Sequence, residues 1–125
     1  MLTFATPGDL SVTYVTQAGL GVKIGSMVVL YGQITTATFT HTTAVGALTI
    51  TGNTITNGSV SVIAACQWQG ITKAGYTDVA GALPAGSATI TFLASGSGVG
   101  TAAVLVADVP TGGTVQVFFT FLFRV

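Results

Sequence analysis

Apolar and polar residues alternate with a period of two along most of the chain. In the stretch LSVTYVT, Leu10, Val12 and Tyr14 fall on one side, and serine and threonine fall on the other. Successive side chains of a strand point to opposite faces, so this pattern predicts β-structure, whereas apolar residues at helical spacing are nearly absent. On this basis, strands are expected at residues 2–5, 10–16, 26–34, 47–51, 59–68, 88–92, 101–107 and 114–125.

Glycine and proline clusters separate these segments and predict the turns. The clusters are PGD at Pro7, GLG at Gly19, NG at Asn57, LPAG at Pro84, SGSG at Ser95 and PTGG at Pro110. Short strands with regular glycine and proline punctuation are typical of sandwiches and jelly rolls. The sequence therefore predicts an all-β fold: a single antiparallel β-sandwich, jelly-roll-like, over residues 10–125, preceded by an N-terminal segment, 1–9.

The C-terminal segment TVQVFFTFLFRV is apolar on both faces. One face carries Val117, Phe119, Phe121 and Phe123, and the other carries Phe118, Thr120 and Leu122. Either set could fill the domain core, and the remaining set then needs a second cover, because a chain without helices offers none of its own. We assign the first set to the core.

Charged residues are scarce. They make up 5% of the 125 residues, against about 25% in ordinary globular proteins, and three acidic and three basic side chains give a formal net charge of zero. Phosphate backbones are bound by clustered lysine and arginine, so no nucleic-acid partner is expected. A nearly uncharged surface instead favours association.

No membrane partner is expected either. A spanning helix needs about 20 consecutive apolar residues, and the longest run free of glycine and polar residues is Ala102 to Ala107. The N-terminus lacks the basic region of a secretory signal, so the sequon at Asn57 is interpreted as part of a turn.

Candidate chemistry is sparse. The one histidine, His41, lies among threonines and is expected to be solvated, and the one cysteine, Cys66, is expected to be a buried, inert thiol. With no glutamate and three dispersed aspartates, we expect no catalytic set, no metal site and no cofactor. The stretch SGSGVG fails the glycine spacing of a nucleotide loop and predicts a hairpin. Trp68 and Tyr76 form a candidate ligand patch, although the alternation also places Trp68 on an inward face.

Several segments taken together resemble a β-sandwich module found in phage tail-fibre and other virion proteins. The resemblance starts in YVTQAGLGVKIGSMVVLYGQI (Tyr14 to Ile34), with its Tyr-x-Thr-Gln-x-Gly and Lys-Ile-Gly motifs. GALTITG (Gly46 to Gly52), SGSGVG and ADVPTGGTVQVFFTFLFRV are similar to later strands of the module. Together they cover about Leu10 to Val125.

This resemblance implies a trimeric virion protein without enzymatic activity. Because the match begins near Met1 and leaves no shaft, we expect a homotrimeric capsid decoration or cement protein on the outer surface of the capsid, bound to the major capsid protein. The trimer interface is expected at Phe118, Thr120 and Leu122. The shell contact is expected in segment 1–9, at Leu2, Phe4 and Pro7.

Two alternatives remain open at this stage. A tail-fibre or head-fibre tip that binds a host receptor or glycan would share the fold. A polysaccharide-degrading spike would need paired carboxylates, which three dispersed aspartates hardly supply.

Overall fold

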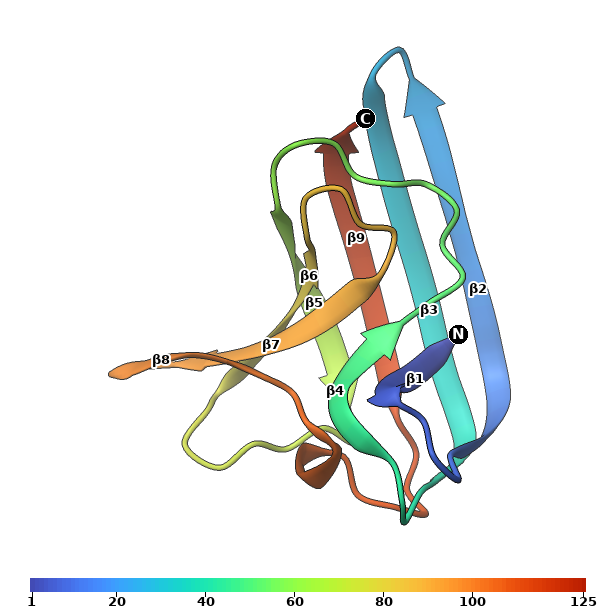
Figure 1. The fold of residues 1–125 in the computed structure, drawn as a ribbon, viewed down its shortest axis with the longest axis vertical. Coiled ribbons are helices and arrows are strands. Elements are labelled where there is room, and N and C mark those ends of the chain that lie inside the picture. Colours follow the sequence, from blue (N-terminus) through green and yellow to red (C-terminus); the bar gives the residue numbers. More distant parts are fainter.

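The structure, a computed structural model, describes residues 1–125, and its regular elements are strands and one short 3-10 turn (Figure 1). The elements in chain order are β1 (Leu2–Thr6), β2 (Ser11–Ile24), β3 (Met27–Thr40), β4 (Val45–Ile50), β5 (Val62–Gln69), β6 (Asp78–Leu83), β7 (Ile90–Gly96), β8 (Val99–Ala103), a 3-10 turn η1 (Val106–Asp108) and β9 (Gln116–Arg124). The all-β prediction is confirmed.

The strands form one antiparallel sheet in the order β1-β4-β7-β6-β5-β9-β3-β2, with β8 paired to β7. The sheet folds over on itself, so that β1, β4 and β7 lie across β3 and β9 in Figure 1. Strand β5 belongs to both halves, because Val62–Ala65 pair with β6 and Cys66–Gln69 pair with β9. The result is the predicted antiparallel sandwich.

The core lies between the two halves and consists of 23 buried residues. Strand β9 supplies four of them, Val117, Phe119, Phe121 and Phe123, which are the set assigned to the core from the sequence. Phe4 from the front layer meets Phe39 of β3 edge to face, with ring centroids 5.6 Å apart. Aromatic side chains of both layers therefore hold the sandwich together.

Strands β2 and β3 form a hairpin that is longer than expected. A turn was predicted at Gly19, but β2 continues to Ile24, and the chain reverses at Gly25, where φ is +61°. Gly19 does not have a positive φ and pairs in register with Gly32 of β3. The turn prediction at Gly19 was wrong because glycine also fits an extended strand where another backbone comes close.

Strand β6 has no counterpart among the predicted strands. Its sequence, DVAGAL, contains a single β-branched residue, Val79, and no aromatic residue, so the signal for a strand is weak. Small residues are needed there, because a Cβ on Gly81 would lie 2.9 Å from Cζ of Phe121. The expected strand at 101–107 is also shorter, since β8 ends at Ala103 and η1 follows.

The N-terminal segment belongs to the sheet. Strand β1 pairs with β4, with Leu2 opposite Ile50 and Phe4 opposite Leu48. The Tyr14 hydroxyl of β2 accepts a hydrogen bond from the Leu2 amide at 3.1 Å and so links the two edges of the sheet. The division into a separate segment 1–9 and a domain 10–125 therefore does not match the structure.

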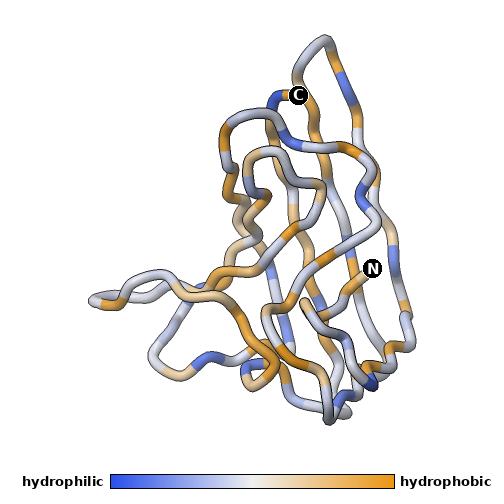
Figure 2. The backbone as a smooth tube through the Cα atoms, in the orientation of Figure 1, coloured by the Kyte–Doolittle hydropathy of each residue, from blue (hydrophilic) through white to orange (hydrophobic).

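Strands β7 and β8 form the hairpin expected from SGSGVG, and it projects from the sandwich on the side opposite β2 (Figure 1). Hydrophilic stretches along the backbone are short and lie scattered among apolar and neutral stretches (Figure 2). No helix in the structure has the length and apolar character needed to cross a bilayer.

Candidate interaction surface

The side of β9 that faces away from the core is uncovered. Phe118 is half-buried, Thr120 is exposed and Leu122 is 59% exposed, whereas the alternating residues Val117 to Phe123 are buried. The structure thus settles the orientation of the last strand and leaves the three predicted interface residues without a cover from the chain itself.

Apolar residues of β2 and β3 extend this uncovered surface. Val22 and Val29 lie beside Leu122 in one row across the three strands, and Leu20 and Tyr31 lie beside Thr120 in the next. We call the outward-pointing residues of this half-sheet the outer face: Ala18, Leu20, Val22, Ile24, Met27, Val29, Tyr31, Gln33, Ala65, Gln67, Phe118, Thr120, Leu122 and Arg124.

The outer face contains a hollow of about 660 Å³. Its lining combines small side chains, at Ala18, Ala65 and Thr120, with larger ones, among them Tyr31 and Phe118. A surface with both a hollow and projecting apolar side chains can interlock with a partner, which a flat face cannot do.

Only one charged side chain belongs to the outer face, Arg124, which lies at its end opposite Met27. The half-sheet has four strands about 4.8 Å apart and about seven residues along β3, which gives a projected area of roughly 440 Å². Most of the side chains on it are apolar, and the largest apolar patch of a subunit, typically about 300–600 Å², is often functional. The outer face is therefore the candidate functional surface.

The predicted shell-contact residues are separated by the fold. Leu2 and Phe4 are 0% and 1% exposed and belong to the core, so their side chains cannot reach a second protein, and this part of the prediction was wrong. The alternation that places them on one side of a strand was the signal for burial. Pro7 is exposed in the turn between β1 and β2.

Trp68 and Tyr76 do not form an open patch. Both are partly buried and pack against the core, Trp68 from β5 and Tyr76 from the loop that follows it. Neither lines one of the three cavities of the structure. The ligand patch stays a prediction, and the geometry favours a packing role for both side chains.

His41 is buried, although it was expected to be solvated. Its Nε2 lies 2.9 Å from the Val109 carbonyl oxygen, to which it donates, and its ring packs edge to face on Phe4 and Phe39 with centroids 5.0 and 5.7 Å away. The neighbouring threonines suggested exposure, but the β3–β4 turn points the ring inward. This histidine has a structural role in the core.

Cys66 is a free, half-buried thiol on the inward side of β5. Burial raises the pKa of this thiol to about 11. Because the thiolate is the reactive form, the side chain is inert at neutral pH.

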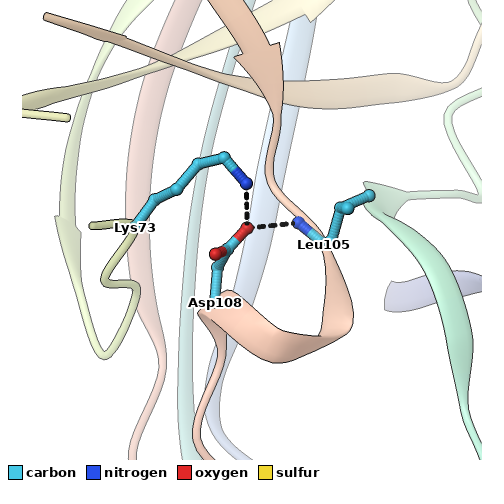
Figure 3. A network of polar contacts seen from close by, with 3 residues as sticks. All are labelled: Lys73, Leu105 and Asp108. Carbon is cyan, nitrogen blue, oxygen red and sulfur yellow. Dashed lines mark hydrogen bonds and ion pairs between the residues drawn. The ribbon is translucent and has the colours of Figure 1, made fainter. Parts of the chain in front are cut away.

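A partly buried ion pair organises the base of the projecting hairpin (Figure 3). The Lys73 Nζ lies 2.8 Å from Oδ2 of Asp108, and the same oxygen accepts a hydrogen bond from the Leu105 amide at 2.8 Å. The ammonium group also lies 5.7 Å from the centre of the Tyr76 ring. These contacts fix the β5–β6 loop to the 3-10 turn and place no free carboxylate in a cavity.

Asp9 is held by the turn between β3 and β4. Its carboxylate accepts hydrogen bonds from the Thr42 and Thr43 amides at 2.9 and 2.7 Å, and from both threonine hydroxyls. The Thr42 hydroxyl and these two amides hold the pKa of Asp9 well below the ordinary aspartate value of 3.8. This carboxylate joins two turns at one end of the sandwich.

The polar side chains described above make their contacts within the fold. The three aspartates lie in β6, in η1 and in the turn after β1, and no group of three or more histidine, cysteine or acidic side chains comes together. The residues that sequence reasoning missed are those of β2. Their signal was present in QAGLGVKIG, where Ala18, Leu20, Val22 and Ile24 alternate with glycine and polar residues.

The chain matches no protein-family model, and no curated protein or solved structure is significantly similar to it. Its function is therefore argued from the surface described above.

Proposed function

We propose that this protein is a non-enzymatic structural component of a phage virion. In this proposal it is a homotrimeric decoration or cement protein on the outer surface of the capsid, bound to the major capsid protein. The resemblance of Tyr14 to Ile34 to a virion module suggests the setting, and the sandwich fold is the one that this resemblance implies. The single observation that carries the proposal is the uncovered outer face.

The outer face supports self-association because it is both apolar and free of charge over nearly all of its extent. Leu20, Tyr31 and Leu122 are each about half exposed in the single chain. Full burial of a large apolar side chain contributes about 1.5–3 kcal/mol, so covering the exposed half of each contributes roughly 1 kcal/mol. In the proposed trimer, neighbouring copies cover Phe118, Thr120 and Leu122 around a three-fold axis.

The proposed function of the trimer is to connect neighbouring coat subunits. Three copies present the same contacts three times, so the second and third contacts form at high effective concentration once the first has formed. Exposed threonine, serine and glutamine side chains form hydrogen bonds without the desolvation cost of charged groups. Of the shell contacts expected from the sequence, Pro7 alone has an accessible side chain in the structure.

A density map of the particle that carries this protein tests the proposal. Density for a trimer at the three-fold or quasi-three-fold positions of the capsid is the expected result. Density confined to the tips of tail or head fibres would overturn it in favour of the second candidate, a fibre tip that binds a host receptor or glycan. The hollow beside Tyr31, with Gln33 and Thr120 on its lining, is the observation that favours the second candidate.

A further inference from the structure

Strand β2 leaves one edge of the sheet open. It is the last strand in the sheet order, and in Figure 1 nothing lies beyond it in the back layer. Its first part is irregular, with register shifts around Tyr14, whose hydroxyl accepts a hydrogen bond from the Leu2 amide of β1. From Gln17 to Ile24 the strand pairs regularly with β3.

The open half of β2 has free backbone groups. In a hairpin with a two-residue turn, the flanking residues Ile24 and Met27 are a hydrogen-bonded pair, and the bonding alternates from there. Four residues consequently direct their N–H and C=O groups away from β3: Gln17, Gly19, Gly21 and Lys23. No backbone or side-chain partner outside the strand ladder bonds to them.

The usual protections of an edge strand are absent from this half. Edge strands of natural proteins usually carry prolines, bulges or charged side chains that prevent pairing with other chains. Here the bulges lie before Gln17, no proline is present, and the one charge is Lys23 near the tip. An unprotected edge of this length is a pairing site.

A groove runs along the inner side of the same edge. It has a volume of about 320 Å³ and lies between Gln17–Gly21 of β2 and the segment from Ile50 to Ile55. A Cβ on Gly19 would meet nothing nearer than the Tyr31 carbonyl oxygen at 3.4 Å, so the space above this glycine is unfilled. Glycine within a strand often marks the close approach of another backbone.

The groove also limits which strands can bind to the edge of β2. A second copy pairing through its own β2 would place Gln17, Gly19, Gly21 and Lys23 on the inner side, and these residues bring no apolar side chain to fill the groove. Of the other edge strands, β8 offers mainly glycine, alanine and threonine, and the large apolar side chains of β1 are already buried in the core. The side chains that line the groove are uncharged, and the one charged group of a lining residue is the Met1 ammonium, which bonds to the Thr51 carbonyl oxygen. A strand that fills the groove should therefore carry uncharged side chains.

We propose that the edge of β2 from Gln17 to Lys23 accepts an extended, uncharged segment of another protein as an added strand. Apolar side chains at alternate positions of that segment enter the groove between β2 and Ile50–Ile55. The edge site uses the backbone groups and the inner side of β2, whereas the outer face is formed by side chains on the opposite side of the same strand, so the proposal does not depend on the proposed trimer.

The test uses the full chain and a synthetic peptide, acetylated and amidated, that alternates threonine and valine over seven residues. In a titration followed by NMR of the ¹⁵N-labelled protein, the amides of Gln17, Gly19, Gly21 and Lys23 should shift saturably and exchange more slowly with D₂O. A peptide with lysine and glutamate in place of valine should leave them unchanged.

Two substitutions of Gly19 test the groove and the free backbone N–H separately. Gly19→Val fills the groove from within and Gly19→Pro removes an outward N–H, and each should weaken binding roughly tenfold or more while the protein stays folded. Gly100→Val on β8 is the matched control, since a Cβ there meets nothing within 4 Å, and it should bind the peptide normally.

Three results would overturn the proposal. These are the absence of saturable shifts along β2, shifts confined to Phe118 and Leu122 on the outer face, and binding that is unchanged in both Gly19 variants. Protection of the β2 amides that rises with protein concentration alone would overturn it too, by identifying a second copy as the occupant. The first three results do not depend on the mass of the oligomer, and the fourth concerns only the amides at the edge of β2, so failure here is distinct from failure of the proposed trimer.

Discussion

The ring of Phe119 lies directly over Gly32, its partner in the adjacent strand, so that a Cβ at this glycine would overlap the ring's Cζ and lie 3.0 Å from both Cε atoms. The missing side chain of β3 thus makes room for an aromatic ring of β9. The ring in turn packs edge to face on Phe121, with centroids 5.7 Å apart. This pairing joins the last strand to the long hairpin.

We expect Gly32→Ala to destabilise the protein by about 1–3 kcal/mol, since the added methyl group forces the Phe119 ring out of its position. Urea denaturation followed by circular dichroism measures the change. Gly100→Ala is the control, because a methyl group there meets open space, and it should change stability by no more than about 0.5 kcal/mol. A Gly32→Ala variant as stable as the control would contradict the described packing.

The Asp9 carboxylate should make stability depend on acid pH. Its pKa is lower in the folded state than the ordinary value of 3.8, so its contribution is fully present above that value and is lost as the pH falls below it. The melting temperature of Asp9→Ala should therefore lie below that of the parent protein at neutral pH, and the difference should shrink as the pH falls below about 4. A difference that is constant with pH would show that the carboxylate charge does not matter.

The ion pair between Lys73 and Asp108 should contribute measurably because both side chains are largely shielded, with 17% and 12% of their surface exposed. Lys73→Met should cost about 1.5–3 kcal/mol, the range for hydrogen bonds to charged groups. A double-mutant cycle with Asp108→Asn isolates the pair, and its coupling energy should fall as salt is added. A coupling energy near zero would mean that the hydrogen bond from the Leu105 amide holds Asp108 in place without help from Lys73.

Deleting residues 1–6 should unfold the protein, contrary to what a separate N-terminal segment would predict. The deletion removes β1 and two core side chains, and Phe4→Ala alone should cost about 3–5 kcal/mol. Loss of near-ultraviolet circular dichroism in the deletion variant is the expected signal. Ala5→Ser is the matched control, since Ala5 is an exposed residue of the same strand.

Much of the fold could be predicted because period-two patterning depends only on which face of a strand is buried. The assignment of Phe119, Phe121 and Phe123 to the core followed from this rule, and so did the inward side of β5. The same rule, applied to the first residues, already implied that Leu2 and Phe4 are buried.

The remainder depends on contacts between residues far apart in the chain. Nothing near His41 in the sequence indicates that its ring will meet Phe4, and nothing near Gly19 shows that its neighbour will be Gly32 rather than a turn. Strand β6 is set by the need for small residues beneath Phe121, which no local propensity expresses. Of the candidate interface, only the β9 residues were predicted, because the contribution of β2 becomes visible once its register with β3 is known.

The central claim is that the outer face joins copies of this chain. Leu122→Ser tests this claim, because Leu122 is exposed in the single chain and its substitution should leave the fold intact. In the proposed trimer the leucine is buried, so its loss should weaken association at least tenfold. Val60→Ser is the matched control, because Val60 is 68% exposed in a loop outside the outer face.

Size-exclusion chromatography with multi-angle light scattering is the most direct measurement. The account predicts three times the chain mass of 12.5 kDa for the parent protein and for Val60→Ser, and dissociation to folded monomers for Leu122→Ser. A parent protein that runs as a stable monomer, or a Leu122→Ser variant that remains a trimer, would contradict it.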